Sequence, residues 1–166
     1  MLDKMVPSLL VGFSLCCPGV ANAQAQTPSP PLYGANVSNE QAHKLVAGAM
    51  AEARKQGFLM AVAVVDTAGQ LVMFERIDGT QTASIRVAQD KATSAATWKR
   101  PTKVFQDTLA SGGVGLRVLS LPGAIPVEGG LPVMADGKVI GAIGVSGGSA
   151  DQDGIVAKAG LDAFAK

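Results

Sequence analysis

The sequence predicts an α+β domain in which helices pack on one antiparallel sheet of about five strands. Two pairs of short apolar runs, each joined by a tight turn, predict two β-hairpins, and strands joined in this way are antiparallel neighbours. Amphipathic or alanine-rich segments precede, separate and follow the hairpins. The predicted order is therefore α-β-β-α-α-β-β-α, within a chain long enough for one such domain.

The first helix is predicted to begin after Ser38, because Ser38 and Gln41 form a capping box. Gly57 is a favourable residue to end it. Residues 58–65 are almost continuously apolar, as in a strand buried on both faces, and a short turn leads into a second strand at 70–77. The apolar residues of the helix recur at one-sided spacing: Ala42, Leu45, Val46, Ala49 and Ala53.

The second half of the chain predicts a second hairpin framed by helices. Asp136 and Gly137 favour a type I′ turn, which requires positive φ at both central residues. The stretch 116–127 is irregular, with room for short extended pieces, and the many alanines between the hairpins allow close helix packing. Three further helices are predicted, at residues 82–97, 102–110 and 151–164.

The N-terminal segment has the pattern of a secretory signal peptide over residues 1–23. Lys4 precedes a mostly apolar run that is too short to span a bilayer, and Ala21 and Ala23 form an A-x-A cleavage site. Both cysteines lie within this segment, so the mature chain would lack a thiol nucleophile or ligand. We therefore expect a periplasmic or secreted protein that is not inserted in the membrane after cleavage.

A proline-rich leader is predicted to follow the signal peptide, over residues 24–36. Its composition is typical of a disordered or extended spacer. A single domain is then expected over residues 37–166.

The charge balance limits the classes of partner. Fourteen Lys and Arg face 13 Asp and Glu, for a formal net charge of +1, and no basic stripe is present. This argues against nucleic acid and anionic membrane surfaces as partners. A weak net charge also leaves self-association unopposed.

His43 is the only histidine of the chain. On the predicted first helix it lies at the edge of the apolar face, near Met50 and Arg54. A single histidine excludes a multi-histidine zinc site but not haem, whose iron takes one or two axial ligands. From spacing alone, the alternative is an ordinary histidine at the boundary of the core.

The densest cluster of charged residues comprises Arg76, Asp78, Asp90 and Lys91. Arg76 and Asp78 close the second predicted strand, and Lys91 lies among alanines and a threonine. Lys91 is suited to hold the carboxylate of a ligand, and is equally able to extend into solvent.

Glycine-rich segments flank the second hairpin, at residues 128–130 and 146–147. Glycine permits close approach of a ligand to the backbone, or serves a loop that needs positive φ. Asp151 and Asp153 occupy the favourable field at the start of the last helix, which argues against an anion-binding nest there. With the charged cluster, these segments define a candidate small-ligand pocket: Arg76, Asp78, Lys91, Glu128, Gly129, Gly130, Ser146 and Gly147.

Short stretches of the chain occur in an order and spacing typical of one protein family. They are residues 64–66 with 68–69, 76–79, 88 with 91–92, 101–102, 129–133 and 141–148, followed by Asp151. On these stretches the sequence resembles the GlcG/HbpS-like family, often described as haem-binding or haem-degrading, over residues 37–164. The family includes the C-terminal domain of certain corrinoid adenosyltransferases.

The resemblance implies a profilin-like sandwich and assembly into dimers, tetramers or octamers. It also implies haem as a ligand, and in some members a histidine of the first helix binds the iron. His43 falls in that helix, so the only metal binding expected here is through haem iron. Bis-histidine ligation within one subunit is excluded, because the chain has one histidine.

Three functional hypotheses follow. The leading one is an exported, oligomeric haem-binding protein (a carrier, a sensor or an accessory to haem degradation), with His43 as axial ligand and Arg76 and Lys91 pairing with propionates. The second is an enzyme or sensor for a small hydroxy acid or other small carboxylate, in which Arg76 or Lys91 holds the carboxylate and Asp78 or Glu128 acts as base. The third is a non-catalytic assembly module whose small residues serve packing alone.

Overall fold

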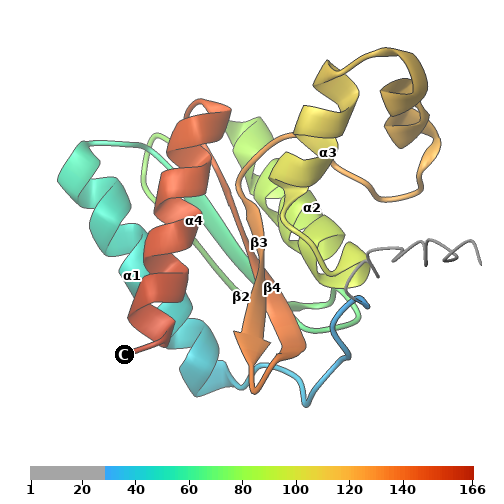
Figure 1. Ribbon diagram of the computed structural model, residues 1–166. Coiled ribbons are helices and arrows are strands. Elements are labelled where there is room, and N and C mark those ends of the chain that lie inside the picture. The colour runs from blue at the N-terminus through green and yellow to red at the C-terminus, as the bar shows by residue number, and fades with distance from the viewer. Residues whose placement is uncertain (1–28) are drawn as a thin grey trace, which may run out of the picture.

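The structure is a computed structural model that describes residues 29–166 (Figure 1). The observed order of helices and strands confirms the predicted one. The predicted signal peptide and the start of the leader lie outside the described residues. No helix among residues 29–166 is both long and apolar enough to cross a bilayer. The elements are α1 Asn39–Gln56, β1 Ala61–Val65, β2 Leu71–Arg76, α2 Thr82–Trp98, α3 Thr102–Ala110, the 3-10 helix η1 Gly113–Ser120, β3 Gly130–Ala135, β4 Lys138–Ser146 and α4 Ala150–Phe164.

The sheet has four antiparallel strands in the order β2-β1-β4-β3. The prediction of about five strands was high by one within the described residues. The stretch expected to supply short extended pieces instead forms the end of η1 and a loop. Gly112 and Gly113, both at positive φ, turn the chain into this 3-10 helix, a conformation incompatible with a strand.

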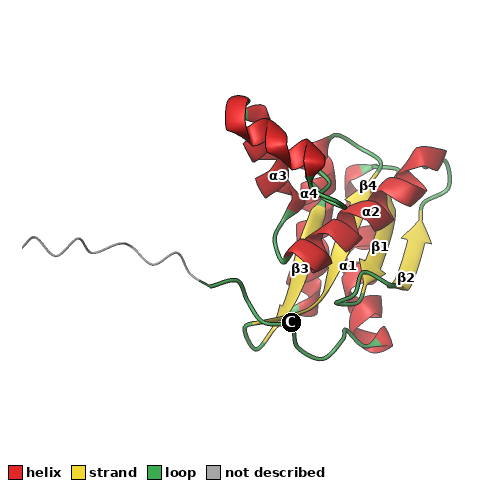
Figure 2. Cartoon of the chain, turned by 90° about the vertical axis from the view of Figure 1, so that its right-hand side faces the viewer, coloured by secondary structure: helices red, strands yellow, loops and turns green. Residues whose placement is uncertain are grey.

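Helices cover both faces of the sheet (Figure 2). On one face, α1 and α4 pack over a core of large side chains such as Leu45, Met50 and Ile143. On the other face, α2 packs through alanines against alanines of β1 and β4. Because these side chains are small, the backbone of α2 comes close to the sheet.

The start of α1 has the predicted capping box. Ser38 accepts a hydrogen bond from the Gln41 amide, and the Gln41 side chain accepts one from the Ser38 amide. Ser149 and Gln152 form a second capping box at the start of α4. Gly57 ends α1 in the left-handed conformation, with φ of 73°. The capping box of α1 and its terminal glycine confirm the sequence-based bounds of this helix.

The segment before α1 is ordered against β4 and α2. The Val139 amide donates to the Leu32 carbonyl, and the Gly34 amide donates to the Val139 carbonyl. The Tyr33 hydroxyl donates to the carbonyl oxygens at the end of α2, at 3.0–3.1 Å. Residues 32–36 were expected to belong to the disordered leader, but these hydrogen bonds tie them to the domain.

The turn between β3 and β4 has the predicted type I′ character, with φ of 49° at Asp136 and 71° at Gly137. Replacing Gly137 by alanine should lower the free energy of unfolding by about 1 kcal/mol, because a Cβ disfavours left-handed backbone. Urea unfolding of the purified protein measures the loss. Asp136→Asn is the matched control and should cost little, since asparagine tolerates this conformation; an equal loss in both variants would contradict the argument.

Candidate functional site

His43 lies in the first third of α1, and its side chain is exposed. The neighbouring Lys44 and Glu40 form an ion pair of 3.4 Å on the same exposed surface. Within residues 29–166, no hydrogen bond or ion pair of the His43 ring was found. The ring is therefore free to meet a ligand or a second molecule.

Arg76 does not lie beside His43. At 1.5 Å per residue, Arg54 is about 16 Å along α1 from His43, and the Arg54 guanidinium pairs with Glu75 of β2 at 2.9 Å. Arg76 follows Glu75, so its side chain emerges on the opposite face of the sheet, the face covered by α2. Within one subunit, the two predicted haem contacts His43 and Arg76 therefore lie apart. His43 is far from the end of α1 that approaches β2, and Arg76 points to the face of the sheet that α1 does not cover.

Lys91 is enclosed between the two helical layers. Its side chain is 1% exposed, and its Nζ donates to Asp153 Oδ2 at 2.6 Å and to the Val145 carbonyl at 3.1 Å. Lys91 belongs to α2 and Asp153 to α4, so the lysine reaches past the sheet at the start of β3. The carboxylate that Lys91 holds in this structure is that of Asp153, not that of a ligand.

The Asp153 carboxyl is surrounded by protein on all sides. Burial raises its pKa, while the Lys91 ammonium and the backbone amides of Gly147 and Gly148 oppose that shift by stabilising the charged form. The Gly148 amide donates to Asp153 Oδ1 at 3.0 Å. These donors supply the partners that a buried carboxylate needs.

Gly129 and Gly130 provide the space for this ion pair. A Cβ on Gly129 would lie 2.9 Å from Lys91 Nζ and 2.8 Å from the Asp153 Cβ. A Cβ on Gly130 would overlap the Lys91 carbonyl. Both glycines are buried, so here they serve close packing and do not border an open pocket.

The remaining residues of the predicted small-ligand pocket lie around the end of β4. Ser146 is 5% exposed, and its hydroxyl donates to the Ser84 hydroxyl of α2. Arg76 and Asp78 are exposed, and Arg76 is in register with Ser146 across Ala61. The sheet therefore brings the predicted residues together at one end of the molecule. The centre of the predicted pocket, however, is filled by the Lys91–Asp153 ion pair and by Gly129 and Gly130.

Sequence reasoning missed the link between Lys91 and Asp153. Asp153 was recognised only as a favourable charge at a helix start. The available signal was a lysine in an alanine face that is otherwise buried, since a buried ammonium requires a carboxylate somewhere. The sequence does not show which carboxylate, because the two residues are 62 positions apart.

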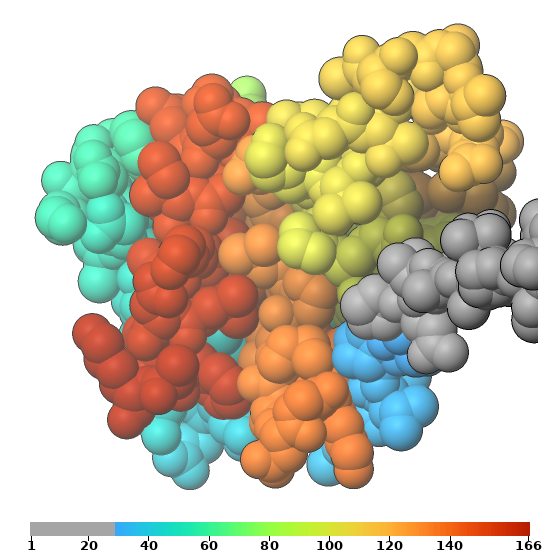
Figure 3. Space-filling model, in the orientation of Figure 1, coloured from blue at the N-terminus to red at the C-terminus, as the bar shows by residue number. Residues whose placement is uncertain are grey.

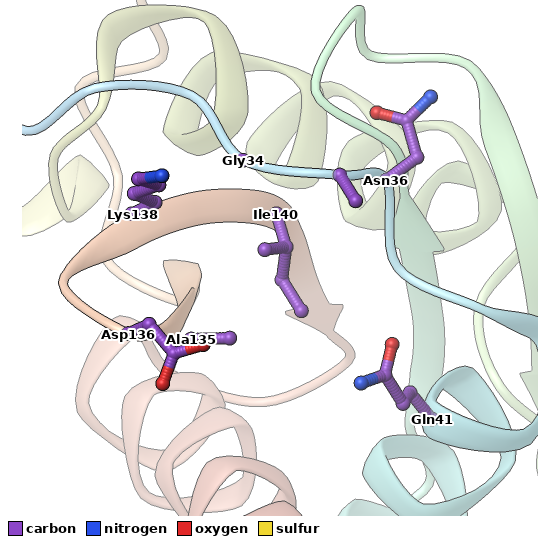
Figure 4. Close-up of a pocket in the computed structure, with 8 residues that line it drawn as sticks. Gly34, Asn36, Gln41, Ala135, Asp136, Lys138 and Ile140 are labelled. Atoms are coloured by element: carbon purple, nitrogen blue, oxygen red, sulfur yellow. The ribbon is translucent and has the colours of Figure 1, made fainter.

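The described surface has clefts at other places. One of about 240 Å³ lies between residues 34–36, the start of α1 and the β3–β4 turn (Figure 4). Gln41 lines it, but the Gln41 side chain is engaged in the cap of α1. Another lies between α2 and the start of β2, where Arg86 pairs with Asp90 at 2.8 Å. Neither contains His43 or the predicted small-ligand residues.

The donor set permits one kind of metal binding. No cluster of three or more His, Cys, Asp or Glu side chains suited to a metal ion occurs in the part of the chain that the structure describes. His43 alone offers an exposed imidazole, which suffices as one axial ligand of haem iron. Since it stands on an open helix surface, a single subunit would cover a bound porphyrin from one side.

Comparison with known proteins identifies the family. A family model described as "Haem degrading protein HbpS-like" matches residues 37–162. The chain belongs to the HbpS-like family. This confirms the resemblance seen in the sequence and fits the α+β sandwich described above.

Three proteins illustrate how similar this chain is to other members of the HbpS-like family. Protein GlcG of Escherichia coli K12 is 35% identical over 110 residues, which cover 66% of this chain and 81% of GlcG. A double mutant of Streptomyces reticuli HbpS has a TM-score of 0.71 and 31% identity, covering 89% of this chain and 97% of HbpS. A complex of PduOC with haem has a TM-score of 0.70 and 27% identity, covering 77% of this chain and 94% of PduOC.

Proposed function

We propose that this protein binds haem as an exported oligomer, with His43 as an axial ligand of the iron. The observation that carries the proposal is that the only histidine of an HbpS-like chain stands exposed on α1. Solved relatives support haem as the ligand, since PduOC of the same fold is described in complex with haem. Bound haem supplies a redox-active, ligand-binding iron, and this chain supplies the imidazole.

Self-association is part of the proposal because the exposed position of His43 leaves one side of a porphyrin uncovered. A second subunit would exclude water from that side. Export is supported by the signal-peptide pattern of residues 1–23. Arg76 and Lys91 are less suited to the propionates of the same haem, since Arg76 lies away from His43 and Lys91 is paired with Asp153.

The carboxylate-binding alternative has weaker support. It requires Lys91 and the segment 128–130 to face a ligand, whereas these residues enclose each other. Arg76, which is exposed, is the member of that set best placed to reach a small carboxylate.

Haemin titration of the purified protein tests the proposal, with the Soret band as readout. Wild type should saturate at one haem per one or two subunits, and His43→Ala should lose the saturable shift. The physical reason is that no other histidine is available to ligate the iron.

Lys44→Ala is the matched control, since it changes an exposed neighbour of His43 on the same helix. It should titrate like wild type. Identical titrations of wild type and His43→Ala would refute the ligand assignment, and a weak, non-saturating shift in wild type would refute haem binding.

A further inference from the structure

Three aspartates of the chain are followed directly by glycine: Asp78, Asp136 and Asp153. In such a pair the aspartate carboxyl can react with the next backbone amide to close a five-membered imide ring, a succinimide. Glycine favours the reaction because it has no Cβ to shield its amide nitrogen. The structure places the three pairs in different surroundings and therefore ranks them as sites of this reaction.

Asp136 and Gly137 form the two-residue end of the β3–β4 hairpin, and both are exposed (Figure 3). The ladder pairs Ala135 with Lys138, which leaves the Gly137 amide inside the turn. Within residues 29–166, no hydrogen bond of that amide and no ion pair of the Asp136 carboxylate was found. A Cβ built on Gly137 would meet nothing within 4 Å. Neither reacting group is thus engaged elsewhere in the described structure.

The φ of 49° at Asp136 suits both turn types that join hairpin strands. Types I′ and II′ share a φ of about 60° at the first central residue and differ in the orientation of the peptide plane that follows it. In type II′ the ψ of that residue is about −120°, which eclipses the next amide nitrogen with Cβ, as a five-membered ring requires. Rotation of one peptide plane therefore prepares Asp136 for ring closure while the strands stay paired, and Gly137 accepts the change in its φ.

Asp78 and Gly79 lie in a turn of a different kind. The Thr80 amide donates to the Ile77 carbonyl at 3.1 Å, and Gly79 has a φ of 86°. Among the described non-glycine residues only Lys99 and Asp136 have positive φ, so Asp78 does not. These features are typical of a type II turn, in which ψ is about +120° at the first central residue and about −30° once the peptide plane is rotated to type I. Neither value eclipses the amide with Cβ, so ring closure at Asp78 requires this turn to open.

Asp153 is the least reactive of the three. Its carboxylate is buried and bonded to Lys91 Nζ and to the Gly148 amide. Gly154 lies inside α4, where backbone amides donate to carbonyls one turn back. Both reacting groups of this pair are therefore occupied, which leaves Asp136 as the favoured site.

We propose that Asp136 converts to isoaspartate through a succinimide formed with the Gly137 nitrogen. The nitrogen bonds to Cγ of the protonated carboxyl, the bond from Cγ to the hydroxyl oxygen breaks, and the hydroxyl leaves with the amide proton as water. Water then adds to either carbonyl of the ring. Opening at Cγ restores aspartate, and opening at the main-chain carbonyl yields isoaspartate. No oxidant or cofactor is consumed, and the mass of the chain is unchanged.

The conversion changes the end of the hairpin. In isoaspartate the backbone runs through Cβ and Cγ, so the turn gains one backbone atom and the free carboxylate moves to Cα. A type I′ turn can then no longer join Ala135 to Lys138. The enzymes that recognise such a carboxylate are methyltransferases that use S-adenosylmethionine, and the exposed hairpin end is accessible to their active sites.

Incubation of the full protein at pH 7 and 37 °C for several weeks, followed by peptide mapping, tests the assignment. Isoaspartate is located by fragmentation of its Cα–Cβ bond in the mass spectrometer and is counted by labelled methyl transfer with an isoaspartyl methyltransferase. In the native protein it should accumulate at Asp136 at least fivefold faster than at Asp78, and not at Asp153. In urea, which removes the turns and α4, the first two sites should react at similar rates and Asp153 should react as well.

Asp136→Glu is the matched control, because it keeps the charge but would have to close a six-membered ring. Methyl acceptance at this position should disappear in that variant. Accumulation at Asp136 that is no faster than at Asp78 in the native protein would overturn the inference. A fivefold preference that persists in urea would also overturn it, because the neighbouring sequence and not the turn would then set the rate. None of these measurements involves haem, so the result is independent of the proposed function.

Discussion

Replacing Asp153 by alanine is expected to lower the free energy of unfolding by about 3–5 kcal/mol. The variant leaves the Lys91 ammonium buried without its carboxylate, and the Val145 carbonyl is the one hydrogen-bond acceptor that the structure shows remaining to it. Urea unfolding followed by circular dichroism measures the loss. The double variant Lys91→Met/Asp153→Leu should recover much of it, because apolar residues can replace a buried ion pair at small cost.

Asp151→Ala is the matched control for Asp153. Asp151 lies in the same first turn of α4 but is exposed, so its loss should cost at most about 1 kcal/mol. Comparable losses at both positions would show that a charge at the helix start matters and the ion pair does not.

The second large effect is expected at Gly144 of β4. Replacing it by alanine should lower the free energy of unfolding by about 3 kcal/mol, at the upper end of the usual cost of overpacking a core. The new Cβ would overlap the Ala88 carbonyl and lie 2.9 Å from the Ala92 Cβ, so α2 would have to move away from the sheet. Thermal and urea unfolding measure the change.

Gly34→Ala is the control for added volume. Its Cβ would lie 3.2 Å from the Ile140 and Lys138 side chains, which can shift, and its φ needs no glycine. A loss below about 1 kcal/mol is expected there. Equal stability of wild type and Gly144→Ala would show that α2 is not held as closely as described.

The sequence predicted the fold well where its signals are local. Capping at Ser38, the end of α1 at Gly57 and the turn at Asp136 each depend on residues a few positions apart, and all three are found. The strand count was wrong because the apolar residues of η1 resemble an extended piece. In the structure Val118 is buried, but Val114, Leu116 and Leu119 are solvent-exposed, so burial could not be read from the hydropathy of this stretch.

The candidate site was harder to predict because it depends on the strand order and on which face each residue takes. Glu75 and Arg76 are neighbours in sequence, yet one faces α1 and the other faces α2. Lys91 allowed two interpretations, a ligand cation or a solvent-exposed side chain, and the structure shows a third. The glycines that match the family are likewise explained by contacts with residues far away in the sequence.

The position of the Lys91–Asp153 pair affects how the domain opens. α2 and α4 cover opposite faces of the sheet, and this pair joins them directly past the start of β3. Neither helix can leave its face without exposing a charge that the other helix neutralises. The layers therefore separate together, so slow amide hydrogen exchange in α2 and α4 reports the same global unfolding event, with no half-open state that bares one side of the sheet.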